Sequence, residues 1–462
     1  MPALQLPDGP KNHPWLQTYR WLTSPLEYME DCAKNYGDIF TIRVGPLSTP
    51  QVFVSNPQAI QQIFSTDPKY LDSGAAAGFK SPLLGNQSLL SLDGKPHQRQ
   101  RKLLTPPFHG ERMLAYGELI RDISQQVTNK WQVGETVSVL SSMQAISFQV
   151  ILKAVFGLAE GPRYEKIKEA LIAILNPKKP LLRSMLLMFP SLRRDLGAWS
   201  PWGEFLRLRQ QIDELVYAEI QERKAQLDSS RTDILSLMMA TRDEAGEPMT
   251  DLELRDELMT LLVAGHETTA TALSWALYWI HHQPQVREKL LQELDTLGEK
   301  PDPNAIFRLP YLNAVCSETL RLYPVAMLLL SRLVKSPLQI GEYQFEPGTL
   351  LIPCVYLTHH REDLYPDSQT FKPERFLERQ FSNSEFIPFG GGNRRCIGMA
   401  FALFEMKLVL ATVLSNWEME LANTQPVLPV RKGLLFGPKG GVQMVVKGRR
   451  EQNQLVPETT SV

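Results

Sequence analysis

Most of the chain has the spacing of apolar positions that is typical of helices, and a few short segments have the alternation that is typical of strands. The region from residue 110 to 320 reads mainly as helix. Alternating or β-branched residues predict short strands at Ile39 to Val44, Gln51 to Val54 and Leu350 to Tyr356. The pattern therefore predicts a mainly α protein with a minor β region.

One long helix has a clear start. Thr250-Asp251-Leu252-Glu253 is a capping box, in which a hydroxyl at the N-cap is followed three residues later by a carboxylate. The helix that it opens continues to about His282, and from Leu258 to Ile280 it is apolar on nearly all sides. Such a helix is expected to cross the interior of a protein.

A polar cluster interrupts this apolar helix at Ala264 to Thr271. A glycine inside a helix costs about 1 kcal/mol relative to alanine, and a buried carboxylate without a partner is also unfavourable, so Gly265 and Glu267 need a reason. One reason is a ligand: the missing side chain at Gly265 opens a groove where a ligand contacts the backbone, and the Thr268 hydroxyl bonds locally or to that ligand. The alternative is that the threonines only bond to the backbone of a buried helix.

The segment from Phe389 to Gly398 reads Phe-Gly-Gly-Gly-Asn-Arg-Arg-Cys-Ile-Gly and places one cysteine before a helix that begins near Met399. Glycines allow close approach of the backbone, and amide groups, arginines and a helix N-terminus favour a thiolate at Cys396. A metal ion gives such a thiolate a function. The alternatives are an inert buried cysteine, a nucleophile, which lacks an adjacent base here, and a phosphate loop, which lacks the Gly-Lys-Ser/Thr ending.

This segment resembles the signature of the cytochrome P450 superfamily, Phe-x-x-Gly-x-Arg-x-Cys-x-Gly. The matching residues are Phe389, Gly392, Arg394, Cys396 and Gly398. The resemblance implies that Cys396 is the thiolate ligand of a haem iron and that Arg394 pairs with a haem propionate. It also implies that Phe389 and Gly398 contact the cofactor.

The polar cluster resembles the oxygen-binding motif of the same family, Ala/Gly-Gly-x-Glu/Asp-Thr-Thr, matched by Ala264, Gly265, Glu267, Thr268 and Thr269. The resemblance implies that haem lies against Ala264 and Gly265, that Thr268 hydrogen-bonds dioxygen and that Glu267 belongs to a proton relay. His266, at the variable position, is interpreted as a packing or surface histidine. Because Ala264 stands where some animal fatty-acid hydroxylases have a glutamate bonded to haem, we expect haem b held without a covalent bond.

Glu318 and Arg321 are three residues apart on a helix predicted from Leu312 to Leu322, and Pro373-Glu374-Arg375-Phe376 follows. Such a pair is common on protein surfaces, where it contributes little. The resemblance implies instead that Glu318, Arg321 and Arg375 form a buried structural triad beneath the cysteine loop.

The resemblance also assigns cationic residues to the haem propionates. The segment from His97 to Arg101 corresponds to a family segment that usually begins with tryptophan and ends with arginine, so both residues are predicted to contact the propionates, with histidine replacing the tryptophan. Arg332 is predicted as a further propionate donor. The alternative for each residue is a solvated surface side chain.

Composition narrows the class of protein. The 462 residues carry a formal net charge of −1, which argues against a nucleic-acid-binding surface and a polybasic membrane anchor. The four cysteines are too scattered for a disulfide framework, and the N-terminal residues resemble neither a signal peptide nor a membrane span. We therefore expect a cytoplasmic protein with one domain over residues 1–462, of which about 449–462 forms a flexible tail.

The resemblance implies the cytochrome P450 fold and a haem-thiolate monooxygenase, which inserts one oxygen atom from O2 into a C–H bond. No flavin or iron–sulfur segment is recognisable, so electrons are expected from a separate protein, a ferredoxin with its reductase. Lys102, Arg395 and Lys407 are candidates for a cationic docking patch, or else solvated charges. The alternative function is a haem-thiolate protein that does not activate O2, a gas sensor or a peroxide isomerase or dehydratase, and Glu267 and Thr268 argue against it.

The expected pocket is apolar. Its candidate wall residues are Phe79, Leu83, Leu84, Val263, Val325, Met327, Leu328 and Phe436. Such a lining favours a long apolar ligand, and the Gly-His-Glu-Thr-Thr form of the motif is similar to cyanobacterial and fatty-acid-hydroxylating branches of the family. A fatty acid or a terpene is therefore the expected substrate.

Overall fold

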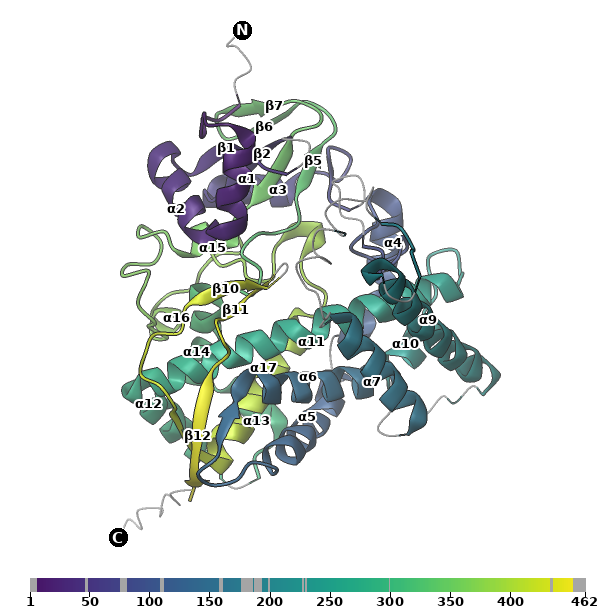
Figure 1. Cartoon of the computed structure of the whole chain (residues 1–462), viewed down its shortest axis with the longest axis vertical. Helices are drawn as coiled ribbons and strands as arrows, with labels where there is room; N and C mark the ends of the chain where they lie inside the picture. Colours follow the sequence, from purple (N-terminus) through teal and green to yellow (C-terminus); the bar gives the residue numbers. More distant parts are fainter. Residues whose placement is uncertain are drawn as a thin grey trace, which may run out of the picture.

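A computed structural model of the chain describes residues 6–45, 49–74, 81–108, 112–157, 161–175, 186, 193–197, 200–226, 228, 231–298, 300–432 and 435–451. Helices form most of the molecule; the purple and green strands lie at one end together with the first two helices, whereas the yellow strands near the C-terminus lie beside the helical part (Figure 1). The helices are α1 (Pro14–Thr23), α2 (Pro25–Tyr36), α3 (Pro57–Ser65), α4 (Gly94–Leu104), η1 (Pro106–Phe108), α5 (Arg112–Thr128), α6 (Val139–Phe156), α7 (Pro162–Leu175), α9 (Pro201–Ala225), α10 (Ile234–Ala240), α11 (Asp251–His282), α12 (Pro284–Asp295), α13 (Pro303–Arg308), α14 (Pro310–Leu322), α15 (Val355–His359), α16 (Arg375–Glu378), η3 (Gly392–Arg394) and α17 (Met399–Asn416).

The strands are short and form four separate sheets. They are β1 (Ile39–Arg43), β2 (Pro50–Val54), β3 (Leu71–Asp72), β4 (Thr136–Ser138), β5 (Arg332–Val334), β6 (Leu338–Ile340), β7 (Tyr343–Phe345), β8 (Leu350–Pro353), β9 (Trp417–Leu421), β10 (Pro429–Lys432), β11 (Leu435–Pro438) and β12 (Gln443–Arg449). The largest sheet has the order β1-β2-β8-β5-β3, and within it only β2 and β8 run parallel. The mainly α fold with a minor β region, predicted from the sequence, is confirmed.

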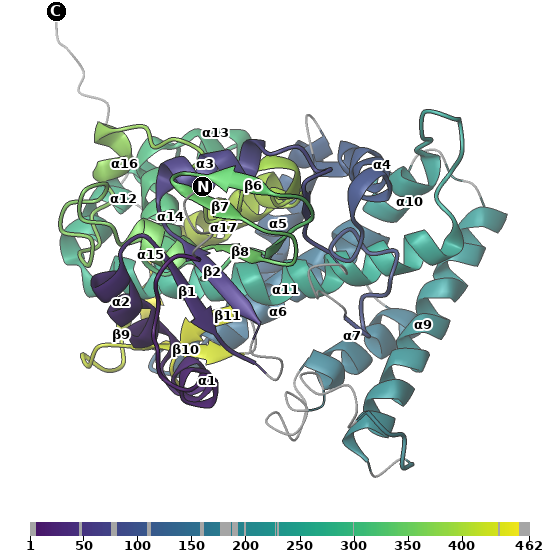
Figure 2. The ribbon, with the colours of Figure 1, turned by 90° about the horizontal axis from the view of Figure 1, so that it is seen from above.

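The long helix α11 crosses the interior, as its apolar sequence predicts. Its capping box is present: the Glu253 N–H donates to the Thr250 hydroxyl at 3.2 Å, and the Thr250 N–H donates to the Glu253 carboxylate at 2.7 Å. The helix packs against α6, α9, α14 and α17. Seen from above, α1 and α2 lie on one side of the molecule and α7 and α9 on the other (Figure 2).

Gly265 serves this packing, which corrects one expectation. A side chain added at Gly265 would point at α6, with its Cβ atom 2.8 Å from the Cδ1 atom of Ile151. The missing side chain therefore lets α11 approach α6 closely, rather than opening a groove for a ligand on that side. The helix is also continuous through the polar cluster.

Two further expectations are corrected at their ends. The predicted strand from Leu350 to Tyr356 ends at Pro353, and α15 follows. The chain forms a helical turn there, in which the Thr358 hydroxyl and N–H both donate to the Cys354 carbonyl. The expected flexible tail does not start at residue 449, since Arg450 pairs with Asp295 of α12 at 2.5 Å. Residues 452–462 lie outside the described part of the chain.

Within the part of the chain that the structure describes, two helices are long and apolar enough to cross a membrane, by length and composition alone. They are α6 (Val139–Phe156) and α17 (Met399–Asn416), and 61% and 67% of their residues are buried inside the fold. Both pack against other helices of the core, α6 against α11 and α17 against α5. Their apolar character is therefore explained by burial in the protein.

Candidate active site

The cysteine loop is a compact turn between the β region and α17. The Cys396 N–H donates to the Phe389 carbonyl at 2.8 Å, which closes the loop. Gly390 and Gly392 have φ angles of +67° and +62°, which favour glycine. A Cβ atom at Gly392 would also lie 2.5 Å from the Phe64 carbonyl oxygen at the end of α3, so this glycine allows the loop to pack against α3.

Gly398 differs from the other loop glycines. A Cβ atom there would meet no protein atom within 4 Å, and its φ of −85° is open to any residue. Protein packing therefore does not require a glycine at this position. A flat group lying against the loop supplies a reason, which fits the predicted haem contact.

Cys396 has an exposed side chain, although the loop lies inside the fold. Burial raises the pKa of its thiol, while a hydrogen bond from the Gly398 N–H and the charges of Arg101 and Arg395 lower it in part. The Cys396 side chain is both exposed and surrounded by protein if its sulfur faces an internal space. Burial raises the pKa of the thiol on balance, so the loop and its arginines favour a thiolate only in part, and a bound metal cation would supply the further stabilisation expected from the sequence.

Three arginines and a histidine gather beside the loop. Burial lowers the pKa of Arg332 to about 9 and that of His97 to about 3, and Arg394 contributes to both shifts. The same pattern holds for Arg101 and Arg394, whose pKa values are lowered chiefly by burial. Asp93 pairs with Arg394 at 2.7 Å and offsets part of this charge. Such a concentration of partly buried positive charge favours an anion, and the two propionates of haem meet that need.

The predicted oxygen-binding residues on α11 are not all buried. Ala264 is exposed although most of the helix is buried, and the Thr268 hydroxyl donates to the Ala264 carbonyl at 2.6 Å. Glu267 is half-buried. His266 is buried edge-on against Phe148, with ring centroids 5.1 Å apart, and burial lowers its pKa to about 4, so it is a packing histidine as interpreted from the sequence.

Glu318, Arg321 and Arg375 form the predicted triad. Arg321 donates to both carboxylate oxygens of Glu318, from Nε at 2.7 Å and from Nη2 at 2.9 Å, and both residues have no exposed surface. Arg375 Nε donates to Glu318 Oε1 at 3.1 Å, and the Lys372 N–H does so at 2.9 Å. The pair is a buried ion pair rather than a surface contact.

His359 links this triad to the cysteine loop, a role that sequence reasoning missed. Arg321 Nη1 donates to the His359 carbonyl at 2.8 Å, and the ring Nε2 accepts the Ile387 N–H at 2.9 Å, just before Phe389. Nδ1 must then carry the ring proton. Burial and the Arg321 charge hold the pKa of His359 well below its usual value, which keeps Nε2 able to accept. Within the sequence, only its position close to the Pro-Glu-Arg-Phe segment hinted at this role.

These features together fit a haem with a cysteine ligand. They are an exposed thiol in a loop packed within the fold, an open face at Gly398, an exposed Ala264 on the helix and a cluster of partly buried arginines. A model of the cytochrome P450 family matches residues 7–444. The chain belongs to the cytochrome P450 family. It is therefore a haem-thiolate monooxygenase, with haem held without a covalent bond and ligated by a cysteine thiolate.

Relatives of known name support the family over nearly the whole chain. Cytochrome P450 135B1 of Mycobacterium tuberculosis is 33% identical over 450 residues, which cover 97% of this chain and 93% of the relative. Cytochrome P450 135A1 of the same species is 32% identical, covering 95% and 94%. Among solved structures, the retinoic-acid-bound cyanobacterial CYP120A1 is 25% identical with a TM-score of 0.82, covering 96% of this chain and all of that chain.

The predicted substrate-wall residues of this P450 separate into two groups. Val263, Val325 and Leu328 are partly exposed. Others are buried in the core, namely Leu83, Leu84, Met327 and Phe436. Phe79 lies outside the described residues. The first group thus presents exposed apolar surface, and the second presents little.

The predicted docking patch is corrected at Lys407. Its side chain is buried, with Nζ donating to the Phe307 carbonyl at 2.8 Å and lying 4.1 Å from the centre of that ring. It cannot contact a partner protein at the surface. Lys102 is exposed and pairs with Glu244 at 2.6 Å, and Arg395 is half-buried.

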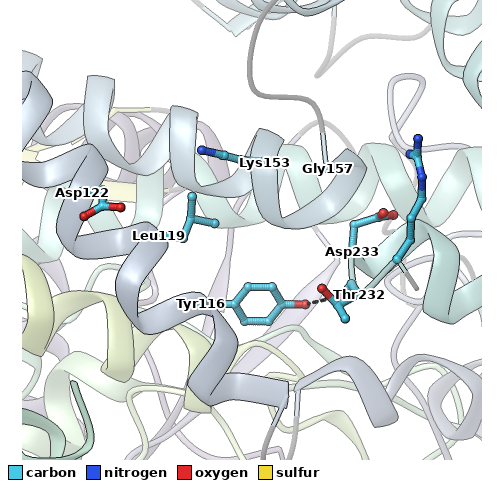
Figure 3. Close-up of a pocket in the computed structure, with 8 residues that line it drawn as sticks. Tyr116, Leu119, Asp122, Lys153, Gly157, Thr232 and Asp233 are labelled. Atoms are coloured by element: carbon cyan, nitrogen blue, oxygen red, sulfur yellow. Dashed lines mark hydrogen bonds between the residues drawn. The ribbon is translucent and has the colours of Figure 1, made fainter. Parts of the chain in front are cut away.

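A separate surface pocket of about 500 Å³ lies between α5, the end of α6 and the segment before α10 (Figure 3). Its lining residues are Tyr116, Leu119, Asp122, Lys153, Gly157, Arg231, Thr232 and Asp233. Figure 3 shows the Tyr116 hydroxyl directed at the Thr232 carbonyl, 3.4 Å away. None of the predicted site residues lines this pocket, so it is distinct from the candidate active site.

Proposed function

We propose that this P450 hydroxylates a long apolar molecule, a fatty acid or a terpene, with electrons from a ferredoxin and its reductase in the cytoplasm. The observation that carries the substrate proposal is that three predicted wall residues, Val263, Val325 and Leu328, are apolar and partly exposed, and that Val263 precedes the exposed Ala264 on α11. A relative of similar fold, the cyanobacterial CYP120A1, has been solved with retinoic acid, an apolar terpenoid acid. Apolar walls favour burial of such a ligand by the hydrophobic effect.

The chain's own residues have separate roles in this proposal. Cys396 would be the ligand of the iron, Phe389 and Gly398 would contact the porphyrin, and four residues would bind its propionates, namely Arg101, Arg394, His97 and Arg332. When bound, haem supplies the iron that activates dioxygen. The overall reaction takes the substrate, O2, two electrons and two protons to the alcohol and water.

Thr268 controls where a proton is held. Its hydroxyl donates to the Ala264 carbonyl at 2.6 Å, so its oxygen keeps two acceptor positions. It can therefore accept a hydrogen bond next to the substrate and orient the proton that is delivered there. Glu267, one residue earlier, is half-buried, which supports a role in exchanging protons with solvent.

The substrate proposal is tested by titrating the holoenzyme with a panel of fatty acids and terpenes while the haem absorption band is followed. Saturable band shifts with one of these classes are expected. Val263→Phe should weaken that shift because the larger side chain reduces the space beside the apolar wall. Leu252→Phe on the same helix is a matched control, since Leu252 is 51% exposed. Shifts with polar compounds only, or equal effects of both variants, would overturn the proposal.

The electron donor is tested separately. Reduction of the substrate-bound enzyme by ferredoxin and its reductase is compared with reduction by a flavodoxin-type donor at matched potential. Faster reduction by ferredoxin is expected. Product formation without O2 or without any donor would contradict the monooxygenase role itself.

A further inference from the structure

The segment from Leu84 to Asp93, between the apolar wall and α4, is fixed to α11 by consecutive buried acidic residues. Asp256 Oδ2 accepts the Gln87 N–H at 2.8 Å, and Glu257 Oε1 accepts the Leu89 N–H at 2.7 Å. Asp256 and Glu257 are 2% and 0% exposed. Buried polar groups need hydrogen-bond partners, so these two side chains of α11 fix the path of the segment.

The local backbone of the segment is adapted to this attachment. Gly85 has a φ of +91°, and a Cβ atom added there would lie 2.2 Å from the Asp256 carboxylate. The Thr260 hydroxyl, one turn after Asp256, also donates to the Ser88 hydroxyl at 2.7 Å. Only glycine at position 85 allows the acidic group to come this close.

The opposite side of the same segment holds Arg394 of the cysteine loop. Arg394 Nη1 donates to the Leu89 carbonyl at 3.0 Å, and Nη2 donates to the Leu92 carbonyl at 2.5 Å and to Asp93 Oδ1 at 2.7 Å. Leu89 is therefore bonded through its N–H to Glu257 and through its carbonyl to Arg394. This one residue connects α11 to the cysteine loop.

These bonds also restrict what Arg394 can do. A guanidinium group has five N–H donors, and three of those of Arg394 have protein acceptors in the described part of the chain. The remaining two, one on Nε and one on Nη1, are left for an anion. Their direction depends on the Leu89 and Leu92 carbonyls, and so on the carboxyl group that holds Leu89.

We propose that Glu257 is a positioning residue that orients Arg394 toward the haem propionate through the Leu89 backbone. The inference rests on the propionate role proposed for Arg394. Without the Glu257 carboxyl group, the Leu89 backbone loses one of the bonds that fix it, and the contact that orients the guanidinium plane is weakened.

The protonation state of the Glu257 carboxyl group predicts which substitution is tolerated. Burial raises its pKa to about 8, and Gln100 counteracts part of this shift, although neither polar atom of Gln100 has a hydrogen bond of good geometry. At neutral pH the side chain is thus largely an uncharged acid that accepts through Oε1. A glutamine has the same shape and the same acceptor, so Glu257→Gln should keep the contact.

The test measures the rate at which the holoenzyme loses haem to an excess of a haem-binding apoprotein. Glu257→Leu is expected to raise this rate about tenfold, and Glu257→Gln to change it by less than about twofold. Glu405→Leu is the matched control, because Glu405 is 1% exposed, burial raises its pKa to about 8 and its partner is Ser147 on α6. It should not share the effect on Arg394.

A double-mutant cycle separates positioning from general destabilisation. Glu257→Leu and Arg394→Lys should be coupled by about fivefold or more in the rate of haem loss, whereas Glu405→Leu and Arg394→Lys should multiply independently. Hydrogen exchange of peptides covering Leu89 should accelerate in Glu257→Leu and not in Glu405→Leu. Should Glu257→Leu fail to fold, Glu257→Asp, which is one methylene too short to reach Leu89, takes its place in the same cycle.

The outcomes are distinguishable. Independent effects of Glu257→Leu and Arg394→Lys, or a Glu257→Gln variant that loses haem as fast as Glu257→Leu, would overturn the positioning role. If Arg394→Lys alone does not change haem loss, the propionate role of Arg394 is wrong, while accelerated exchange at Leu89 would still report the contact with Glu257.

Discussion

Replacing Arg321 with alanine tests whether the buried triad determines haem binding. In the structure Arg321 makes two bonds to Glu318, one to the His359 carbonyl at 2.8 Å and one to the Thr370 carbonyl at 3.2 Å. Removing it leaves Glu318 fully buried with Arg375 as its remaining cation. Breaking a buried ion pair in this way costs about 3–5 kcal/mol.

That cost is large against the whole stability of a folded protein, about 5–15 kcal/mol. It also falls on the element that positions the cysteine loop, because Arg321 holds His359 and His359 accepts the Ile387 N–H. We therefore expect Arg321→Ala to be purified with little haem and with a lowered midpoint of thermal unfolding. Arg321→Lys keeps the charge but not the paired donors, so its haem content and unfolding midpoint should lie between those of the unmodified protein and those of Arg321→Ala.

The matched control is Lys168→Ala. Lys168 forms an i,i+3 pair with Glu165 at 3.2 Å, the same spacing as the triad pair, but the two side chains are 37% and 55% exposed. Such a contact contributes under about 1 kcal/mol. Haem content per folded protein and the unfolding midpoint are measured for both variants. If Arg321→Ala matches Lys168→Ala in both, the buried triad does not support the haem site.

Three further predictions concern the ligand, the proton and pH. Cys396→Ser should abolish the red-shifted carbon monoxide spectrum of a thiolate-ligated ferrous haem, and a retained spectrum would exclude Cys396 as the ligand. Thr268→Ala should keep haem but divert electrons to hydrogen peroxide; unchanged coupling of electron use to product argues against its role. Among the described residues, buried histidines with a lowered pKa, such as His266 and His281, outnumber buried carboxyl groups with a raised pKa. Below pH 6.5 the unfolded chain therefore takes up more protons than the folded chain. The free energy of unfolding, measured by urea titration, should fall as the pH drops below 6.5. A flat profile contradicts this reasoning.

Local signals in the sequence were sufficient for the elements whose formation depends on neighbouring residues. The capping box at Thr250 predicted the start of α11, and the spacing of Glu318 and Arg321 on one helical face predicted their contact. The cysteine loop was recognised from ten consecutive residues. In each case, the residues that interact are close in the sequence, so their pattern is visible without the fold.

Features that depend on distant segments could not be predicted in this way. Gly265 faces Ile151, more than a hundred residues earlier, and nothing near it in the sequence indicates that a helix packs there. Lys407 reads as a surface cation, but the Phe307 ring and carbonyl bury it. The strand predicted at Leu350 to Tyr356 has the right composition for its whole length, and its early end follows from the helical turn closed by Thr358.

The two sides of the haem site are held by separate buried acidic groups. Glu318 acts beneath the cysteine loop through Arg321 and His359, so its loss is expected to disturb the iron ligand. Glu257 acts from α11 through Leu89 and Arg394, so its loss is expected to disturb the propionate contact. Because the two networks share no residue in the described chain, variants of the triad should change the spectrum of the thiolate complex as well as the haem content, whereas variants of Glu257 should change the rate of haem loss and not that spectrum. Additive effects on stability when Arg321→Lys is combined with Glu257→Leu would support this separation, and strong coupling would show that the two networks do not act independently on the cysteine loop.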